Sequence, residues 1–201
     1  MNVATLREGI SYQGGLLALF STVTAAALVI AAVYTSPAIH VAEQHDLETS
    51  LAQVLPQGYN DNNLLQDVVH VKDADGVDVE VHRASKAGAL KAAVFTTSSS
   101  GYAGPIVILV GISRDGVVQG VRVLRHNETP GLGDKIDEAK TNWIHAFEGK
   151  ALATAKWLVK KDGGDFDQFA GATITPRAVV KAVKEALEFH QAHLDAIYAS
   201  K

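Results

Sequence analysis

The feature that most constrains this chain is a long stretch without ionised side chains near its N-terminus. Residues 9–42 contain no Lys, Arg, Asp or Glu, and within them the twenty residues GLLALFSTVTAAALVIAAVY (Gly15–Tyr34) are predominantly apolar. At a rise of about 1.5 Å per residue, a helix of this length matches the roughly 30 Å hydrocarbon core of a bilayer. The pattern predicts a transmembrane helix over 15–36, with Tyr34 at an interface and Pro37 at the helix exit.

The charges that flank this run predict its orientation. Arg7 precedes it, whereas no Lys or Arg follows it until Lys72, and several acidic residues come first. The positive-inside rule places residues 1–14 in the cytoplasm and the domain 45–201 across the bilayer, which is the periplasmic side of a bacterial inner membrane. The alternative is a cleaved signal peptide, although its apolar region usually has only about 7–15 residues. Both interpretations export the rest of the chain.

The composition excludes several classes of function. The chain has no cysteine, so it has no disulfide, no Cys-ligated zinc or iron–sulfur cluster and no c-type haem attachment of its own. Its net charge of −4 and the lack of a basic stripe argue against a nucleic-acid partner. His126 and Glu128 lie close in sequence, but two ligands without a third are too few to predict a metal site. An electron carrier of this composition would need an organic cofactor.

From about His45 the sequence predicts one α+β domain, a mostly antiparallel sheet with helices packed on it. Asp46–Pro56 reads as a short amphipathic helix, and Arg114–Gly116 as a hairpin turn. Apolar, β-type runs predict strands over 65–71, 77–82, 92–97, 106–112, 117–124 and 155–160. Two further helices are predicted over 135–149, with Ile136, Trp143, Ile144 and Phe147 inward, and over 176–199, with one face formed by Val179, Val183, Ala186, Leu187, His190, Leu194 and Ile197.

The stretch GATITP (Gly171–Pro176) introduces the last helix with an unusual run of small residues. Thr175 is predicted as the N-cap and Pro176 as the first helical residue, where a missing N–H has no cost. Gly171 and Ala172 leave space beside the backbone, and Thr173 follows them near the unpaired N–H groups of the helix start. Such a place suits a phosphate group. An ordinary strand-to-helix turn explains the same residues, and these physical arguments leave both possibilities open.

A family resemblance bears on this choice. DQFAGAT (Asp167–Thr173) resembles the flavinylation signal of exported FMN-binding domains, an Asp, two free positions, Ser or Thr, and then Gly-Ala-Thr; Ala170 stands where the family usually has a hydroxyl residue. HNETPGLGDKI, WLVKKDGGDFDQF and GATITPRAVVKAVK resemble the G subunit of Rnf-type (also called Rsx) ion-translocating electron transport complexes, which has a counterpart of the N-terminal span. A sister family is the C subunit of sodium-pumping NADH:quinone reductase.

The resemblance implies a cofactor and its binding residues. FMN would be joined through a phosphoester to Thr173 by a flavin transferase that uses FAD and recognises Asp167. Glu128 would support a loop that wraps the flavin, and of the two lysines Lys160 and Lys161, Lys161 would reach the ring or phosphate. A cation there favours a reduced, anionic flavin. The complete set of cofactor-binding residues implied in this way is Gly171, Ala172, Thr173, Thr175, Glu128, Thr129, Pro130, Gly131, Leu132, Gly133 and Lys161.

Without the resemblance, the loop 128–133 is a weak G-x-G phosphate motif or a plain surface loop, and the two lysines are a solvated charge pair. With it, the chain is expected to be an electron-transfer subunit, not catalytic alone, that works with other subunits of a membrane complex coupling ferredoxin and NAD redox chemistry to ion movement. One apolar helix without a buried charge cannot form an ion path. The alternatives are an anchored FMN domain of another respiratory reductase chain and a non-redox anchored module.

Overall fold

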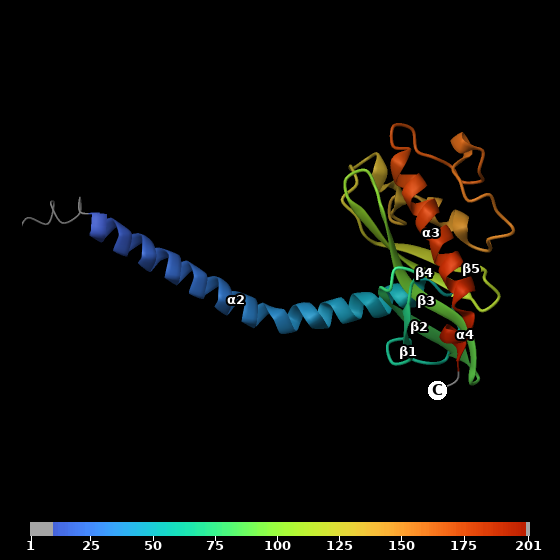
Figure 1. Cartoon of the computed structure of the whole chain (residues 1–201), viewed down its shortest axis with the longest axis horizontal. Coiled ribbons are helices and arrows are strands. Elements are labelled where there is room, and N and C mark those ends of the chain that lie inside the picture. The colour runs from blue at the N-terminus through green and yellow to red at the C-terminus, as the bar shows by residue number, and fades with distance from the viewer. Residues whose placement is uncertain (1–9, 200–201) are drawn as a thin grey trace, which may run out of the picture. The chain divides into compact units, whose positions relative to one another are not determined.

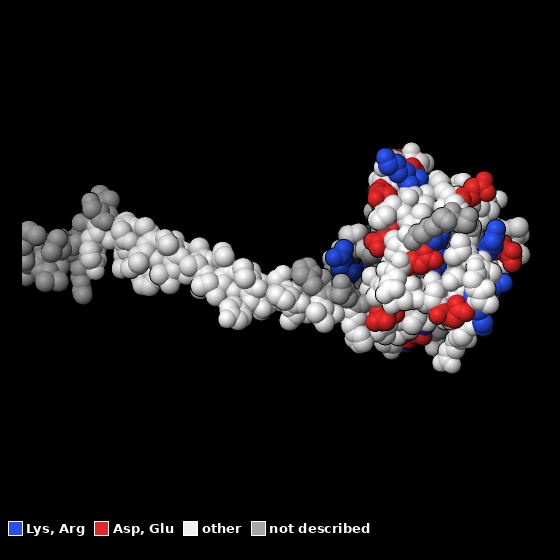
Figure 2. Space-filling view, turned by 90° about the horizontal axis from the view of Figure 1, so that it is seen from below, with Lys and Arg blue, Asp and Glu red and all other residues white. Residues whose placement is uncertain are grey.

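The computed structural model describes residues 10–199. The chain divides into two compact units, Met1–Asp46 and Leu47–Lys201. Most of the predicted cytoplasmic segment, including Arg7, lies outside the described residues. In the first unit a single helix dominates, α2, which spans Ile10–Gln53 and ends in the second unit (Figure 1). Its residues Tyr12–Ile39 are long and apolar enough to cross a membrane, and their surface carries no charged side chain (Figure 2).

The expected helix exit at Pro37 is wrong, because Pro37 lies inside α2. A proline in a helix interior removes one backbone N–H donor and crowds the preceding turn, but the residues after it retain their own donors, so the helix can resume. The separate amphipathic helix predicted over Asp46–Pro56 is therefore the last part of α2, which ends at Gln53.

The second unit contains a five-stranded antiparallel sheet in the sequential order β1-β2-β3-β4-β5, which confirms the predicted α+β class. Figure 1 shows α3 lying across one face of this sheet. The strands are β1 (Val68–Lys72), β2 (Asp78–Lys86), β3 (Ala89–Ser100), β4 (Pro105–Ser113) and β5 (Val118–Arg125). The helices are α3 (Ile174–Ala192), α4 (Leu194–Tyr198) and the short 3-10 turns η1 (Gly133–Ile136), η2 (Asn142–Phe147) and η3 (Lys160–Asp162).

The sheet is buried on both faces, which is why β4 reads as a wholly apolar run. Side chains such as Ile108 and Val110 join the main core under α3, whereas Leu109 joins a smaller core on the other face with Leu51 and Val94. The paired glycines Gly111 and Gly120 let the chain at Val54 approach the sheet, since a Cβ on either would lie 2.6–2.7 Å from the Val54 carbonyl oxygen. Both positions therefore require glycine, because the chain at Val54 leaves no room for a side chain.

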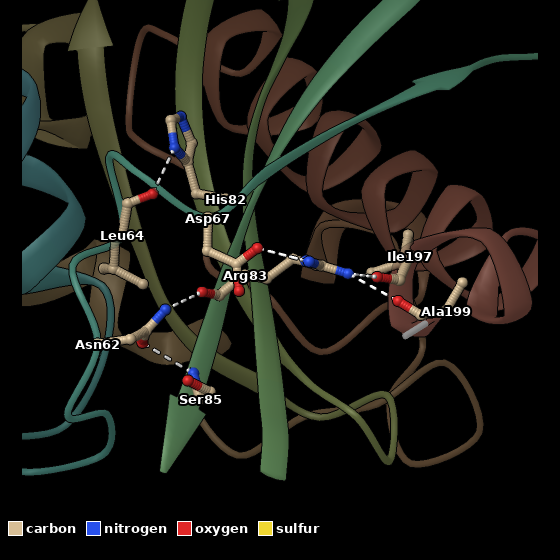
Figure 3. Close-up of polar contacts among 8 residues, drawn as sticks. All are labelled: Asn62, Leu64, Asp67, His82, Arg83, Ser85, Ile197 and Ala199. Carbon is tan, nitrogen blue, oxygen red and sulfur yellow. Dashed lines mark hydrogen bonds and ion pairs between the residues drawn. The ribbon is translucent and has the colours of Figure 1, made fainter. Parts of the chain in front are cut away.

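A buried arginine ties the C-terminal end of the domain to the sheet (Figure 3). The Arg83 guanidinium, on β2, donates to Asp67 Oδ1 (3.0 Å from Nε) and to the Ala199 carbonyl (2.9 Å from Nη1). The Asn62 side chain donates to the Arg83 carbonyl at 2.8 Å and accepts the Ser85 N–H at 2.9 Å. A guanidinium that is only 4% exposed needs such partners, because an unpaired buried charge is strongly destabilising.

Two predicted elements are not formed. The helix predicted over 135–149 is replaced by η1 and η2, because the Thr141 hydroxyl donates to the Lys135 carbonyl at 2.7 Å and accepts the Trp143 N–H at 3.2 Å. These side-chain bonds compete with the helical ladder. Of the four residues expected inward, Ile136, Ile144 and Phe147 are buried and Trp143 packs on the core. The strand predicted over 155–160 is reduced to one bridge between Val159 and Phe166.

The last predicted helix, 176–199, is divided into α3 and α4 at His193. The His193 ring Nδ1 lies 2.9 Å from the Phe189 carbonyl, and its backbone N–H donates to the same oxygen at 3.1 Å. The expected inward face is otherwise correct, since all its members are buried except Leu194, which is 36% exposed.

Candidate functional site

A cavity of about 290 Å³ lies where the start of α3 meets the loop after β5. It brings together two segments that are far apart in sequence, 128–133 and 171–174. We call it the loop cavity, and its lining residues are Tyr102, Glu128, Thr129, Leu132, Gly133, Gly171, Ala172, Thr173 and Ile174.

The loop 128–133 is a tight turn built on one carbonyl. The Thr129 carbonyl oxygen accepts the N–H groups of Leu132 (3.1 Å) and Gly133 (3.0 Å), and Gly131 supplies the positive φ of 78° that the turn needs. A Cβ on Gly133 would lie 2.8 Å from the Glu128 Cβ and 2.9 Å from the Thr175 Oγ1. Gly133 therefore allows the loop to pack directly against the start of α3.

Glu128 joins three segments around the cavity. Its side chain is only 4% exposed, and its Oε1 accepts the Ala103 N–H at 3.0 Å while its Oε2 accepts the Thr175 hydroxyl. The carboxylate thus links its own loop to the turn between β3 and β4 and to the first turn of α3. Two donors aimed at one buried carboxylate compensate for removing its charge from water.

His126 supports the same loop and fixes its own tautomer. Its Nδ1 accepts the Glu128 backbone N–H at 3.0 Å, so in the neutral ring the proton is on Nε2, which donates to Asp137 Oδ2 at 3.0 Å. His126 and Glu128 are therefore engaged with protein partners. Across residues 10–199, no group of three or more His, Cys, Asp or Glu side chains is arranged to hold a metal ion.

The segment Asp167–Thr173 is held from both sides. The Trp143 indole N–H donates to the Asp167 carbonyl at 2.8 Å, and the Trp143 ring packs edge-on against Phe169. Phe169–Ala172 forms a turn in which the Ala172 N–H donates to the Phe169 carbonyl at 3.1 Å, with Gly171 at φ 80° as its third residue. A type II turn requires a positive φ at this position, which explains the glycine in GAT.

The start of α3 differs from the prediction. The helix begins at Ile174, with Thr173 as N-cap residue in helical conformation (φ −79°, ψ −27°) and without a capping hydrogen bond from its side chain. The prediction of Thr175 as N-cap is wrong, because its hydroxyl is buried and donates to Glu128. Thr173, in contrast, is half-buried and faces the loop cavity. The first N–H groups of this 19-residue helix lie next to it.

Lys161 does not line the loop cavity. It lies in η3 with an exposed side chain, and its backbone N–H donates to Gln168 Oε1 at 3.2 Å. Its neighbour Lys160 pairs with the exposed Asp167 carboxylate at 2.7 Å. Asp162 receives a bidentate bond from Arg177 (2.6 and 2.7 Å), and this hydrogen bond lowers the pKa of the Asp162 carboxyl.

The structure therefore brings most of the predicted site residues together and leaves some at a distance from the lining. Thr175 lies beneath the cavity, Pro130 and Gly131 are exposed in the loop, and Lys161 and Asp167 are outside the lining. Sequence reasoning missed Tyr102 and Ile174. The only signal for Tyr102 is a bulky aromatic residue in the turn GYAG (Gly101–Gly104).

Comparison with known proteins gives this site a family. Residues 101–188 match the model of the FMN-binding domain, a range that contains all nine residues of the loop cavity. The crystal structure of Shewanella oneidensis NqrC superposes with a TM-score of 0.61 over 80% of this chain and 100% of that chain; at 20% identity, this shows the shared fold.

Curated relatives match almost the whole chain. The G subunit of the ion-translocating oxidoreductase complex of Stutzerimonas stutzeri is 50% identical over 190 residues, 93% of this chain and 83% of the relative. The proteins of the same name from Cereibacter sphaeroides (strain ATCC 17023) and Vibrio vulnificus are 45% and 44% identical, over 90% and 94% of this chain and 84% and 93% of theirs. The resemblance deduced from the motifs is thus confirmed, and the chain belongs to the family of G subunits of ion-translocating oxidoreductase complexes.

Proposed function

We propose that this chain carries FMN esterified to the Thr173 hydroxyl and passes electrons between neighbouring subunits of a membrane-bound, ion-translocating oxidoreductase complex. The observation that carries the proposal is the loop cavity, in which an uncommitted hydroxyl at the start of α3 faces the loop 128–133. The names of the relatives support the place of the chain in such a complex, in preference to another reductase chain.

The residues of the cavity fit the phosphate end of FMN. The N-terminus of α3 offers unpaired N–H groups and the positive end of the helix dipole, which attract a phosphate. Gly133, Gly171 and Ala172 place little bulk beside Thr173. Both oxygens of Glu128 already accept hydrogen bonds from protein donors, so its negative charge is compensated within the protein and requires no positively charged group on the ligand.

The rim of the cavity fits the flavin ring. Tyr102, Leu132 and Ile174 are 71%, 41% and 48% exposed, which leaves apolar surface for a flat aromatic group. FMN supplies electron-transfer chemistry when bound, whereas the protein orients it and sets its surroundings. Lys161 is proposed to approach the ring or phosphate from η3, since its side chain is exposed and its backbone is bonded to Gln168 of the flavinylation segment.

Attachment would be carried out by a flavin transferase with FAD as donor. The Thr173 oxygen forms a bond to the FMN phosphorus, the pyrophosphate P–O bond breaks, AMP leaves with the bridging oxygen, and the hydroxyl proton is released. Asp167 is proposed as a recognition residue, because its carboxylate is exposed next to the turn that presents Thr173. Thr175 is a poor acceptor, since it is 1% exposed and its hydroxyl is bound to Glu128.

The apolar part of α2 is proposed to anchor the chain in the bacterial inner membrane. Its 28 residues, Tyr12–Ile39, span about 42 Å as a helix, enough to cross the roughly 30 Å lipid core. Arg7 before the span and the acidic residues after it favour a cytoplasmic N-terminus, a periplasmic domain 45–201 and a single pass. A covalent bond would then prevent loss of the flavin from a compartment without free FMN.

The test compares hydroxyl removal at two neighbouring threonines in the full chain, co-expressed with a flavin transferase. Thr173→Val should abolish flavin fluorescence of the band in a denaturing gel, Thr173→Ser should retain part of it, and Thr175→Val should retain it. Intact mass and peptide mapping then identify the modified residue. Unmodified wild-type protein, or flavin retained in Thr173→Val, would refute the proposal. A non-redox anchored module predicts no flavin in any variant.

A further inference from the structure

The turn Gly101–Gly104, between β3 and β4, carries an aromatic side chain with no place in the core. Tyr102 lines the loop cavity and is 71% exposed, while the Gly101 N–H closes the turn on the Gly104 carbonyl at 2.8 Å. Within the described part of the second unit, every other Phe, Tyr and Trp is buried or half-buried. Ligand cavities are lined mainly by apolar and aromatic side chains, and an exposed aromatic ring in the wall of a cavity offers a flat surface to a bound group.

This turn is fixed relative to the start of α3. Glu128 Oε1 accepts the Ala103 N–H at 3.0 Å, and a side chain on Gly101 would collide with the same carboxylate oxygen and with Ile106. The other oxygen of Glu128 holds the hydroxyl of Thr175, two residues beyond Thr173. The backbone that carries Tyr102 is therefore linked through one buried carboxylate to the helix turn that carries Thr173.

We propose that Tyr102 forms the aromatic wall against which the isoalloxazine ring lies, and that it tunes the ring by this contact; the inference rests on FMN being attached at Thr173. Flat aromatic groups gain dispersion and burial from offset stacking on a tyrosine. The phenol is electron-rich and the oxidised flavin is electron-poor, so the contact stabilises the oxidised ring more than the reduced one. Tyr102 therefore makes the midpoint potential of the attached flavin more negative.

The contact also has an optical consequence that is independent of enzymatic activity. A phenol against the ring transfers an electron to the photoexcited flavin and takes it back, so emission is quenched without net chemistry. Unfolding separates the two groups. The ratio of flavin emission in the native protein to emission after denaturation thus reports the contact for each attached flavin, whatever fraction of the chain is loaded.

The experiment uses the full chain in detergent, flavinylated in the cell, with Tyr102→Ala, Tyr102→Phe and Tyr102→Trp. Tyr102→Ala is expected to raise the emission ratio several-fold and to move the midpoint potential, measured by spectroelectrochemistry, to a more positive value. Tyr102→Phe, which keeps the volume, is expected to raise the emission ratio as well. Tyr102→Trp restores an electron-rich ring and is expected to keep the ratio low. Tyr34→Ala, in the apolar helix, is the matched control and should behave as wild type.

The outcomes separate this inference from the proposed function. If the denatured wild-type band lacks flavin fluorescence, the attachment itself fails. If flavin is attached but the emission ratio and the midpoint potential are the same in wild type, Tyr102→Ala and Tyr102→Phe, the role of Tyr102 is refuted while the attachment stands. An equal rise in the Tyr34→Ala control would also refute it, because the effect would then not depend on the cavity.

Discussion

Glu128→Ala tests whether one buried carboxylate holds the loop cavity together. In the native chain its two oxygens accept the Ala103 N–H, at 3.0 Å, and the Thr175 hydroxyl. Truncation removes both acceptors at once. It also removes the side-chain atoms of Glu128 beyond Cβ, including the carboxylate that lies beside Gly133 where the loop 128–133 packs against α3.

The magnitude follows from the surroundings of the two donors. Thr175 is 1% exposed, so its hydroxyl loses its acceptor in a place that water does not reach, which costs about 1–3 kcal/mol. Ala103 is exposed, and water can replace the carboxylate at its N–H. Adding the lost packing of the side chain, the expected loss of unfolding free energy is about 3 kcal/mol, equivalent to roughly 6–12 °C in Tm for a domain of this size.

The assay is thermal unfolding of the full chain in detergent, expressed without a flavin transferase so that stability is separated from cofactor content. Both tryptophans, Trp143 and Trp157, lie in the unit Leu47–Lys201, so selectively excited tryptophan fluorescence reports this unit alone. The exposed control Glu188→Ala loses only a surface pair with Lys184 (3.1 Å) and should change stability by less than about 0.5 kcal/mol.

Glu128→Gln refines the test. Its amide oxygen can accept from one donor while its amide group donates to the Thr175 hydroxyl oxygen, so most of the stability should remain, with a loss of about 1 kcal/mol. The reasoning is refuted if Glu128→Ala unfolds within about 0.5 kcal/mol of wild type, or if Glu128→Gln is as unstable as Glu128→Ala.

Two further predictions concern stability and loading. Burial lowers the pKa of His190 from 6.5 to about 4, so the unfolded chain binds a proton more readily than the folded chain. The free energy of unfolding is therefore highest above pH 6.5 and falls as the pH drops toward 4, by about 2 kcal/mol at pH 5. Unfolding midpoints of wild type and His190→Gln measured from pH 7.5 to 5 should diverge, and parallel curves would contradict this. Gly133→Ala should cost about 1–3 kcal/mol through contact with Glu128 and Thr175 and should lower flavin content in the denaturing gel. If Gly133→Ala left the unfolding free energy and the flavin content unchanged, the loop would have space for a Cβ and the prediction would be wrong.

The sequence was sufficient to predict the secondary structure wherever the local hydrophobic pattern matches the burial in the fold. The apolar run 15–34 reads as helix because it is long and uncharged, and the five strands read from their apolar residues because the sheet is covered on both faces. The inward face of α3 follows from spacing alone. The motif residues of 128–133 and 171–173 were identified through the family resemblance, since local physical arguments also allow a surface loop and an ordinary strand-to-helix turn.

The failures have a common physical origin. Thr141 interrupts the expected helix over 135–149 through bonds to the Lys135 carbonyl and the Trp143 N–H. Thr175 has the sequence signal of an N-cap residue, but its hydroxyl donates to Glu128, 47 residues away in the chain. In both cases a threonine hydroxyl bonds to a partner other than the one that the helix pattern predicts, and local propensity does not specify that partner.

By itself, the sequence determined the apolar helix, the α+β class, the family and the segment that presents Thr173, since these depend on local composition and on motif residues. Only the tertiary structure decided which of the two threonines is free, that Tyr102 lines the same cavity as Thr173, and that Lys161 stays outside the cavity lining. The reason is that a buried carboxylate is stable only when it accepts hydrogen bonds. The donors to Glu128 come from two segments, at Ala103 and Thr175, that no local sequence pattern connects with it.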